Sequence, residues 1–131
     1  MDSQSDSLTP RPMNSPLAKG AIVGTVLQVL MVVCGHYMPQ IAAMFPIVGT
    51  LIGGVAGFVA ARGTGTVLSL PSAAGNGAAA GLISGVLGTG VSIALGDVPM
   101  STLAIAAGST GILGAVGGAI ARQMGMKGAT A

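Results

Sequence analysis

Ionisable side chains are scarce in this sequence. Only 6% of its 131 residues are Asp, Glu, Lys or Arg, and 51% are hydrophobic, whereas about 25% charge is typical of a soluble domain. Glutamate is absent, and there is one histidine and one cysteine. Active sites and metal sites are built from several such groups, and nucleic acid needs clustered Lys and Arg. We therefore expect no enzyme, no metal centre and no nucleic-acid partner, and the single cysteine excludes an intrachain disulfide.

Aromatic residues are equally rare. Tyr37, Phe45 and Phe58 are the whole supply, and tryptophan is absent. Solitary membrane proteins usually carry Trp and Tyr belts at both interfaces, so this scarcity favours a perimeter covered by partner subunits. It also bears on His36, which could be the axial ligand of a tetrapyrrole at the end of a membrane helix. Tetrapyrrole pockets tend to be lined with aromatic rings, so we expect no cofactor and keep His36 as a candidate ligand that Asp97 could meet at the rim.

What the sequence does have is long apolar runs. Each is close to the ~20 residues with which a helix crosses ~30 Å of hydrocarbon, and none alternates with a period of two. Because backbone groups in lipid must be hydrogen-bonded within their own segment, these runs predict helices. The runs span residues 18–36, 40–61, 77–95 and 102–122.

The fold class predicted from these runs is all-α, an integral membrane four-helix bundle made of two hairpins that turn at Pro39 and Pro99. Asn76 is the expected N-cap of the third helix. The chain then divides into a polar, flexible N-terminal tail (1–16), a first transmembrane hairpin (17–62), a cytoplasmic connector (63–75), a second transmembrane hairpin (76–124) and a short C-terminal tail (125–131).

The second and fourth runs resemble each other. The sequence TLIGGVAGFVAAR at 50–62 returns as TGILGAVGGAIAR at 110–122, with a shared Thr, shared glycines and an Ala-Arg ending. Because each hairpin has an even number of spans, the two copies would point the same way through the membrane. The expected arrangement is therefore a tandem (parallel) repeat, unlike the inverted repeats of many transporters.

Basic residues predict the orientation. In a four-span arrangement all five of them lie on the side of the tails and the connector: Arg11, Lys19, Arg62, Arg122 and Lys127. The positive-inside rule assigns this side to the cytoplasm. We expect a multi-pass protein of the cell (inner) membrane with both termini in the cytoplasm.

Glycines recur three or four residues apart in every run. Membrane helices associate where missing side chains let their backbones approach, so these stripes are expected to be helix-packing faces. A specialised glycine zipper lining a pore is the alternative interpretation. The glycines in question are Gly20, Gly24, Gly49, Gly53, Gly57, Gly77, Gly81, Gly85, Gly114 and Gly118.

Neutral polar residues are expected at mid-membrane depth, at Gln28, Thr50, Ser84 and Thr110. Hydrogen bonds of this kind between membrane helices average ~0.6 kcal/mol, so their default role is to hold helices together. The alternative is a polar lining for a small solute, for which Gln28 is the most informative residue. The absence of ionisable residues inside the spans argues against proton coupling.

These features predict a non-catalytic, small polytopic membrane protein. We expect it to pack by its glycine-rich faces as an accessory or structural subunit of a larger membrane complex, for example an energy-transducing one. Its expected partners are the lipid bilayer and either other membrane subunits or further copies of itself. The alternative is a small homo-oligomeric channel, a transporter or a holin-like pore.

Overall fold

The computed structural model describes residues 15–62 and 69–130 of the chain. Its elements are α2 (Pro16–Tyr37), the short α3 (Pro39–Ala42), α4 (Phe45–Arg62), α5 (Leu70–Ala94) and α6 (Thr102–Thr130). Four of them, α2, α4, α5 and α6, are long and apolar enough to cross a membrane. This confirms the predicted all-helical class with four candidate spans and indicates a small polytopic membrane protein.

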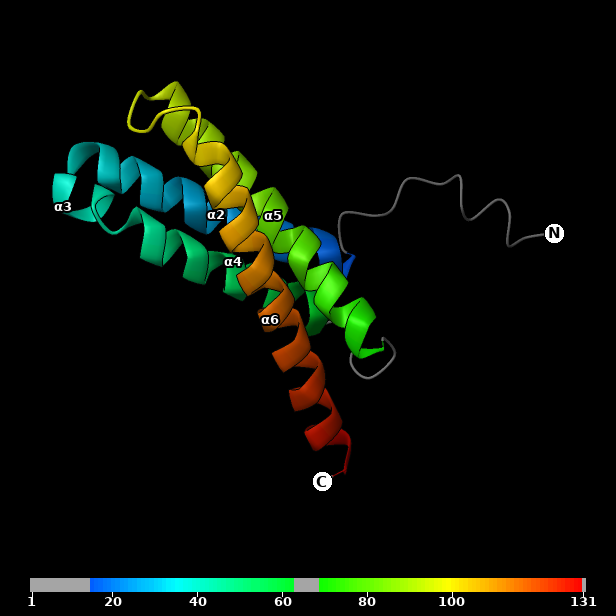
Figure 1. Cartoon of the computed structure of the whole chain (residues 1–131). Coiled ribbons are helices and arrows are strands. Elements are labelled where there is room, and N and C mark those ends of the chain that lie inside the picture. The colour runs from blue at the N-terminus through cyan, green and yellow to red at the C-terminus, as the bar shows by residue number, and fades with distance from the viewer. Residues whose placement is uncertain (1–14, 63–68, 131) are drawn as a thin grey trace.

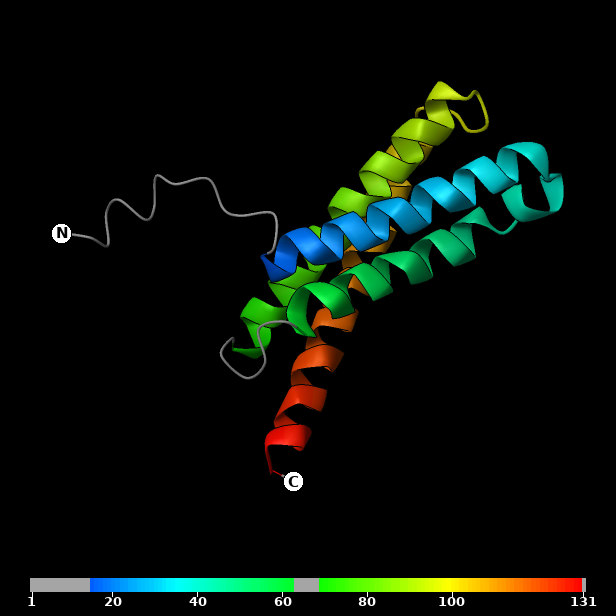
Figure 2. The same ribbon diagram turned by 180° about the vertical axis from the view of Figure 1, so that it is seen from behind.

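The long helices form two hairpins that cross each other (Figures 1 and 2). α2 and α4 lie side by side and are joined through α3, and α5 and α6 lie side by side and are joined by a short turn. α4 and α5 pack against each other, and α2 and α6 each pack against both of them. The two hairpins therefore share one interface rather than forming separate bodies.

Small residues occupy the interior, and large apolar side chains point outward. Buried clusters are formed by alanines, namely Ala56, Ala60 and Ala80 in one place and Ala61, Ala73 and Ala121 in another. By contrast, Ile105 and Ile112 on α6 are 73% and 65% exposed. Lipid tails solvate such side chains as well as a protein core does, so membrane helices gain little by hiding them and pack instead where side chains are small.

The second apolar run is interrupted, contrary to the expectation of one helix over 40–61. The chain forms α3, turns at residues 43–44 and starts again as α4 at Phe45. The cause is Pro46, which lacks an N–H and whose ring would clash with the carbonyl of Ala42 one turn earlier in a continuous helix. Proline is tolerated in the first turn, which is where α4 holds it.

α5 begins at Leu70, so the expected helix start near residue 76 was too late. Ser69 is its N-cap and accepts a hydrogen bond from the backbone N–H of Ser72 at 3.3 Å. Pro71 lies in the first turn, where its missing N–H costs nothing. Asn76 lies inside the helix, and the expected connector at 63–75 includes helical residues 70–75, while residues 63–68 and the tail at 1–14 are outside the described residues. The expected C-terminal tail is helical as far as Thr130.

The turn between α5 and α6 depends on Gly96. Its φ of +80° is in the left-handed region, which L side chains rarely adopt. The N–H of Gly96 bonds to the carbonyl of Ile93, and the N–H of Asp97 bonds to that of Ser92, each at 2.9 Å. These two hydrogen bonds form the pattern of a Schellman cap. They fix the position of Asp97 relative to the last turn of α5.

Candidate functional site

α4, α5 and α6 meet with their backbones in contact. A Cβ added at Gly57 would collide with the backbone of Gly114 on α6, and so would one added at Gly77 on α5. A Cβ at Gly53 would lie 2.7 Å from the Cα of Thr110. Because Gly53 faces Thr110 and Gly57 faces Gly114, the contact advances in the same direction along both chains, and α4 and α6 run parallel.

α2 is seated on α4 and α5 in the same way. A Cβ at Gly20 would collide with the backbone of Ala56, and one at Gly24 would lie 2.5 Å from the Cβ of Ala56 and 2.8 Å from that of Ser84. The remaining glycines of the sequence-derived set, Gly49, Gly81, Gly85 and Gly118, are also buried. Gly49 differs from the others, because a Cβ there would meet no atom closer than 3.4 Å.

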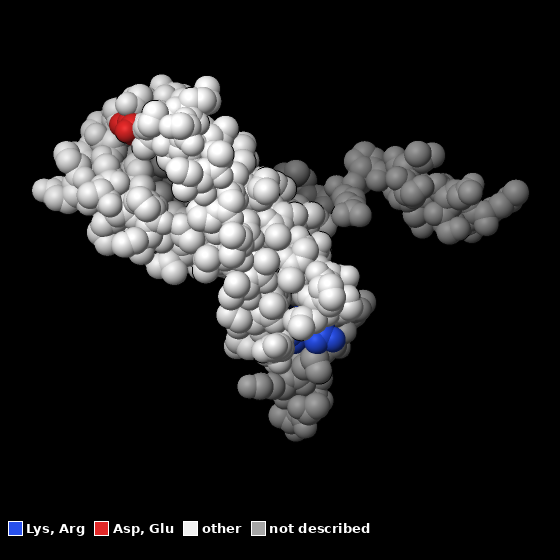
Figure 3. Space-filling view, viewed as in Figure 1, with Lys and Arg blue, Asp and Glu red and all other residues white. Residues whose placement is uncertain are grey.

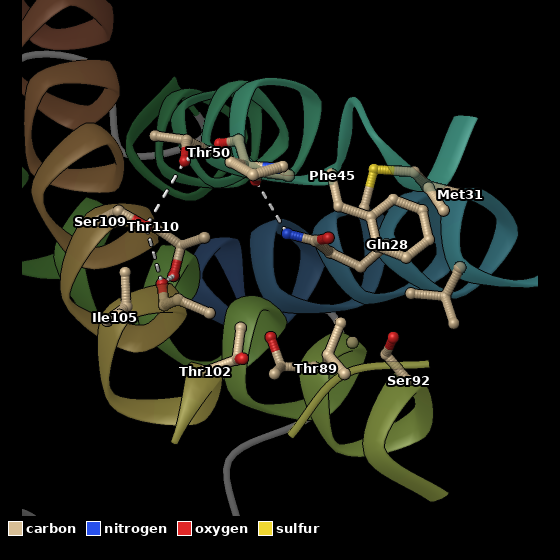
Figure 4. Close-up of a pocket in the computed structure, with 17 residues that line it drawn as sticks. Gln28, Met31, Phe45, Thr50, Thr89, Ser92, Thr102, Ile105, Ser109 and Thr110 are labelled. Carbon is tan, nitrogen blue, oxygen red and sulfur yellow. Dashed lines mark hydrogen bonds between the residues drawn. The ribbon is translucent and has the colours of Figure 1, made fainter. Parts of the chain in front are cut away.

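A cavity of about 420 Å³ opens beyond this packed region, on the side of the two turns (Figure 4). α4 and α6 are in contact at Gly53 and Thr110, and nearer the turns the hydroxyls of Thr50 and Ser109 lie 3.4 Å apart at the cavity. The exposed lining residues are Pro46 on α4 and Ile105 on α6. The cavity therefore opens sideways between α4 and α6, within the candidate spans.

Gln28 forms part of the cavity wall. Its side chain is 4% exposed, and its Nε2 donates to the backbone carbonyl of Gly49 at 2.9 Å. A carbonyl can only accept, so the amide nitrogen faces α4 and the Oε1 atom is left as an acceptor beside the cavity (Figure 4). Gly88 makes room for this side chain from the other side, because a Cβ there would lie 2.5 Å from the Cβ of Gln28.

The other predicted mid-membrane residues fall into two places. Thr50 and Thr110 line the cavity, but each hydroxyl donates at 2.6 Å to a carbonyl of its own helix, that of Pro46 and that of Ala106. Ser84 does not line the cavity. It is fully buried, and its hydroxyl donates to the carbonyl of Gly81 at 3.0 Å. Of the three predicted mid-membrane hydroxyls, two therefore lie at the cavity and one lies away from it, and all three donate hydrogen bonds to carbonyls of their own helices.

Ser92, which sequence reasoning missed, also lines the cavity. Its side chain is 2% exposed, and in the described part of the chain its Oγ is a buried polar atom without a hydrogen-bond partner. Such an atom is unusual, because buried hydroxyls nearly always find a partner. The signal that could have found it is helical spacing, since Ser92 follows Gly85 and Gly88 on the same face of α5.

Three further hydroxyls, those of Thr89, Thr102 and Ser109, complete the polar part of the wall (Figure 4). The lining includes no Asp, Glu, Lys, Arg or His among the residues that the structure describes. The rest of the wall is apolar, with Phe45, Met31 and Val32 among its members. The cavity thus offers neutral hydrogen-bonding groups on an apolar background and no counter-charge for an ion.

His36 and Asp97 meet at the turn end of the molecule. The Nδ1 of His36 lies 2.9 Å from the Oδ1 of Asp97, with side chains 37% and 18% exposed. The pair connects the C-terminal end of α2 to the turn between α5 and α6, and Tyr37 stacks edge-on against the His36 ring at 5.3 Å. Within residues 15–62 and 69–125, no three His, Cys, Asp or Glu side chains gather as a metal site would require.

The described basic residues lie away from this end. Figure 3 shows Asp or Glu at one end of the molecule and Lys or Arg at the other. Lys19 is in the first turns of α2, and Arg62 and Arg122 follow the buried parts of α4 and α6. The Arg62 guanidinium carbon lies 5.7 Å from the centre of the Phe58 ring. The side chain of Lys127 is outside the described residues, as is Arg11.

No protein family, curated protein or solved structure matches this chain.

Proposed function

We propose that the chain is a non-catalytic accessory subunit of a larger membrane assembly, made of two tandem hairpins that both enter from the cytoplasmic side. The parallel course of α4 and α6 supports the tandem arrangement, because the related stretches 50–62 and 110–122 meet along it. The separation of acidic from basic side chains at opposite ends of the molecule supports the orientation (Figure 3).

Exposed glycines inside the spans carry this proposal. A Cβ at Gly90 on α5 or at Gly108 on α6 would meet nothing within 4 Å, and neither residue has a positive φ. Glycine in a helix costs up to ~1 kcal/mol relative to alanine, and nothing within the described chain uses its small size at these two positions. Exposed alanines lie four residues away on the same helices, at Ala94 and Ala104. Small residues at this spacing allow a further helix to approach closely.

The scarcity of aromatic residues agrees with this role. Tyr37 is 79% exposed near the turn end of the molecule, and Phe45 and Phe58 are only partly exposed. The outer faces of the spans instead present aliphatic side chains such as Leu30 and Leu51, which are 57% and 58% exposed. Such a perimeter has few anchors of its own at the interfaces, so neighbouring subunits would supply them.

The experiment is native electrophoresis of the full chain extracted from its own membrane in a mild detergent. We expect the wild type to migrate in a larger complex and the double variant Gly90→Leu/Gly108→Leu to migrate as a small particle, because leucine would hold a partner helix away. Cys34→Leu is the matched control, since it enlarges an exposed position on the other hairpin, and should stay in the complex. A wild type that migrates alone as a small particle rules the subunit role out.

A channel or transporter is the second candidate, and the polar cavity favours it. Towards the basic end, however, α5 and α6 are in backbone contact at Gly81, Thr110 and Gly114. This contact leaves no path between these two helices from the cavity to the basic end. Conduction would need these helices to separate or a path between copies of the chain. Solute flux into liposomes should then fall on replacing Gln28 with leucine, and flux that this change leaves unaltered would remove the cavity from any such path.

A further inference from the structure

We propose that the cavity between the hairpins is a binding site for an uncharged, membrane-soluble amphiphile with a hydroxyl head, such as a long-chain or isoprenoid alcohol or a diacylglycerol. The site does not depend on the proposed role as a subunit. It follows from the unpartnered Ser92, from the acceptor that Gln28 leaves free, and from the sideways opening of the cavity.

The opening determines where the ligand comes from. Gln28 on α2 and Gly88 on α5 form the back of the cavity, and Ala42 and Val98 line it towards the turns. The front lies between Pro46 and Ile105, two exposed lining residues that belong to candidate spans. A ligand therefore enters from the bilayer, which selects a molecule with a hydrocarbon body that can stay partly in the lipid.

The wall determines the head group. Gln28 Oε1 is an acceptor, because its amide nitrogen is committed to Gly49. The Ser92 hydroxyl is both a donor and an acceptor and points into the cavity (Figure 4). An alcohol is both a donor and an acceptor as well, so it can satisfy both side chains, whereas a ketone could not donate to Gln28 and a hydrocarbon could satisfy neither.

The same wall excludes charged heads. No ionisable side chain lines the described cavity, so a carboxylate or an ammonium would lose its hydration without gaining a counter-charge. The volume of about 420 Å³ is near the lower end of the range for small-molecule sites. It can therefore hold a head group and the first part of a chain, while the remainder extends through the opening.

The test uses the full-length protein in lipid nanodiscs with an alkyne-tagged, photoreactive hexadecanol as the probe. We expect saturable labelling that untagged hexadecanol displaces, and at least tenfold weaker competition from palmitate and from hexadecane. Ser92→Ala should weaken binding of the probe about fivefold, which corresponds to the loss of one neutral hydrogen bond. Ala106→Phe, which adds a ring at a position that lines the cavity, should abolish saturable labelling.

Ser84→Ala is the matched control, because it removes a buried serine hydroxyl from the same helix at a position outside the cavity. Its labelling should equal that of the wild type. The thermal unfolding midpoint of each variant shows whether it is folded, and Ser92→Ala carries the test even if Ala106→Phe fails to fold. Equal labelling of Ser92→Ala and wild type, or equal competition by hexadecane and hexadecanol, would overturn the proposal.

Discussion

At Gly57 the missing side chain is a packing requirement, because any Cβ would enter the backbone of α6 at Gly114, whereas at Gly108 it would meet open space. At Gly96 glycine is needed for its backbone conformation, since a φ of +80° in the turn after α5 is one that other residues rarely adopt. Glycine content alone therefore does not show which positions hold the molecule together. Only the contacts with the facing helix show whether the isolated chain would tolerate a larger residue in place of a given glycine.

The first prediction concerns this distinction. Gly57→Ala should destabilise the protein by about 1–3 kcal/mol, because α4 and α6 must move apart to admit the methyl group. Gly108→Ala should leave the stability of the purified chain unchanged or slightly raised. The measurement is reversible unfolding in mixed detergent micelles. Equal stabilities for the two variants would mean that the contact between α4 and α6 is looser than described.

At the scale of the element, the helix ends are set by local chemistry. Ser69 and Pro71 start α5, and Pro46 forces α4 to start afresh after α3. Each of these signals is present in the sequence, but none is decisive there, because serine and proline also occur inside membrane helices. The apolar runs predicted the four long helices but not the short α3, since hydropathy is a property of a whole segment. The exact ends depend on which backbone group each side chain reaches.

The second prediction tests the start of α5. Ser69→Ala should increase amide hydrogen exchange at Ser72 and Ala73, because the first turn loses its side-chain cap, at a cost of ~1 kcal/mol. Asn76→Ala, at the position that sequence reasoning favoured, should have no such effect. If instead Asn76→Ala alone raised exchange at the amides that follow it, α5 would begin later than the structure has it.

The cavity could be predicted from the sequence only in part. Gln28, Thr50 and Thr110 stand out as polar residues in apolar runs, and all three line it. Ser92 does not stand out, because a serine near a helix end usually bonds to its own backbone or to water. Its significance lies in the missing partner, which depends on the helices that face α5. The sideways opening likewise results from how the hairpins cross, which no local pattern records.

At the scale of the whole molecule, the two hairpins are joined in two different ways. At the middle and towards the basic residues, the backbones touch through glycine and alanine. At the turn end, the junction consists of side chains, with one partly exposed pair between His36 and Asp97. Exposed pairs of this kind contribute ~0–1 kcal/mol. The basic half is therefore the firmer part of the structure, and the half with the cavity is the part that can adjust.

The third prediction concerns the orientation of the whole molecule. In a Cys34→Ala background, Met100→Cys lies in the α5–α6 turn, where the native side chain is 69% exposed, and Gln123→Cys lies beside Arg122. A membrane-impermeant maleimide added to intact cells should label the first variant and should label the second only after permeabilisation, because the basic side is cytoplasmic. The reverse pattern would invert the proposed topology and would leave the fold unaffected.

Ser92 has two roles at once. Its hydroxyl lies on the cavity wall, and its carbonyl accepts the N–H of Asp97, the residue that fastens the second hairpin to His36 on the first. Ser92 therefore belongs both to the cavity wall and, through Asp97, to the contact between the two hairpins.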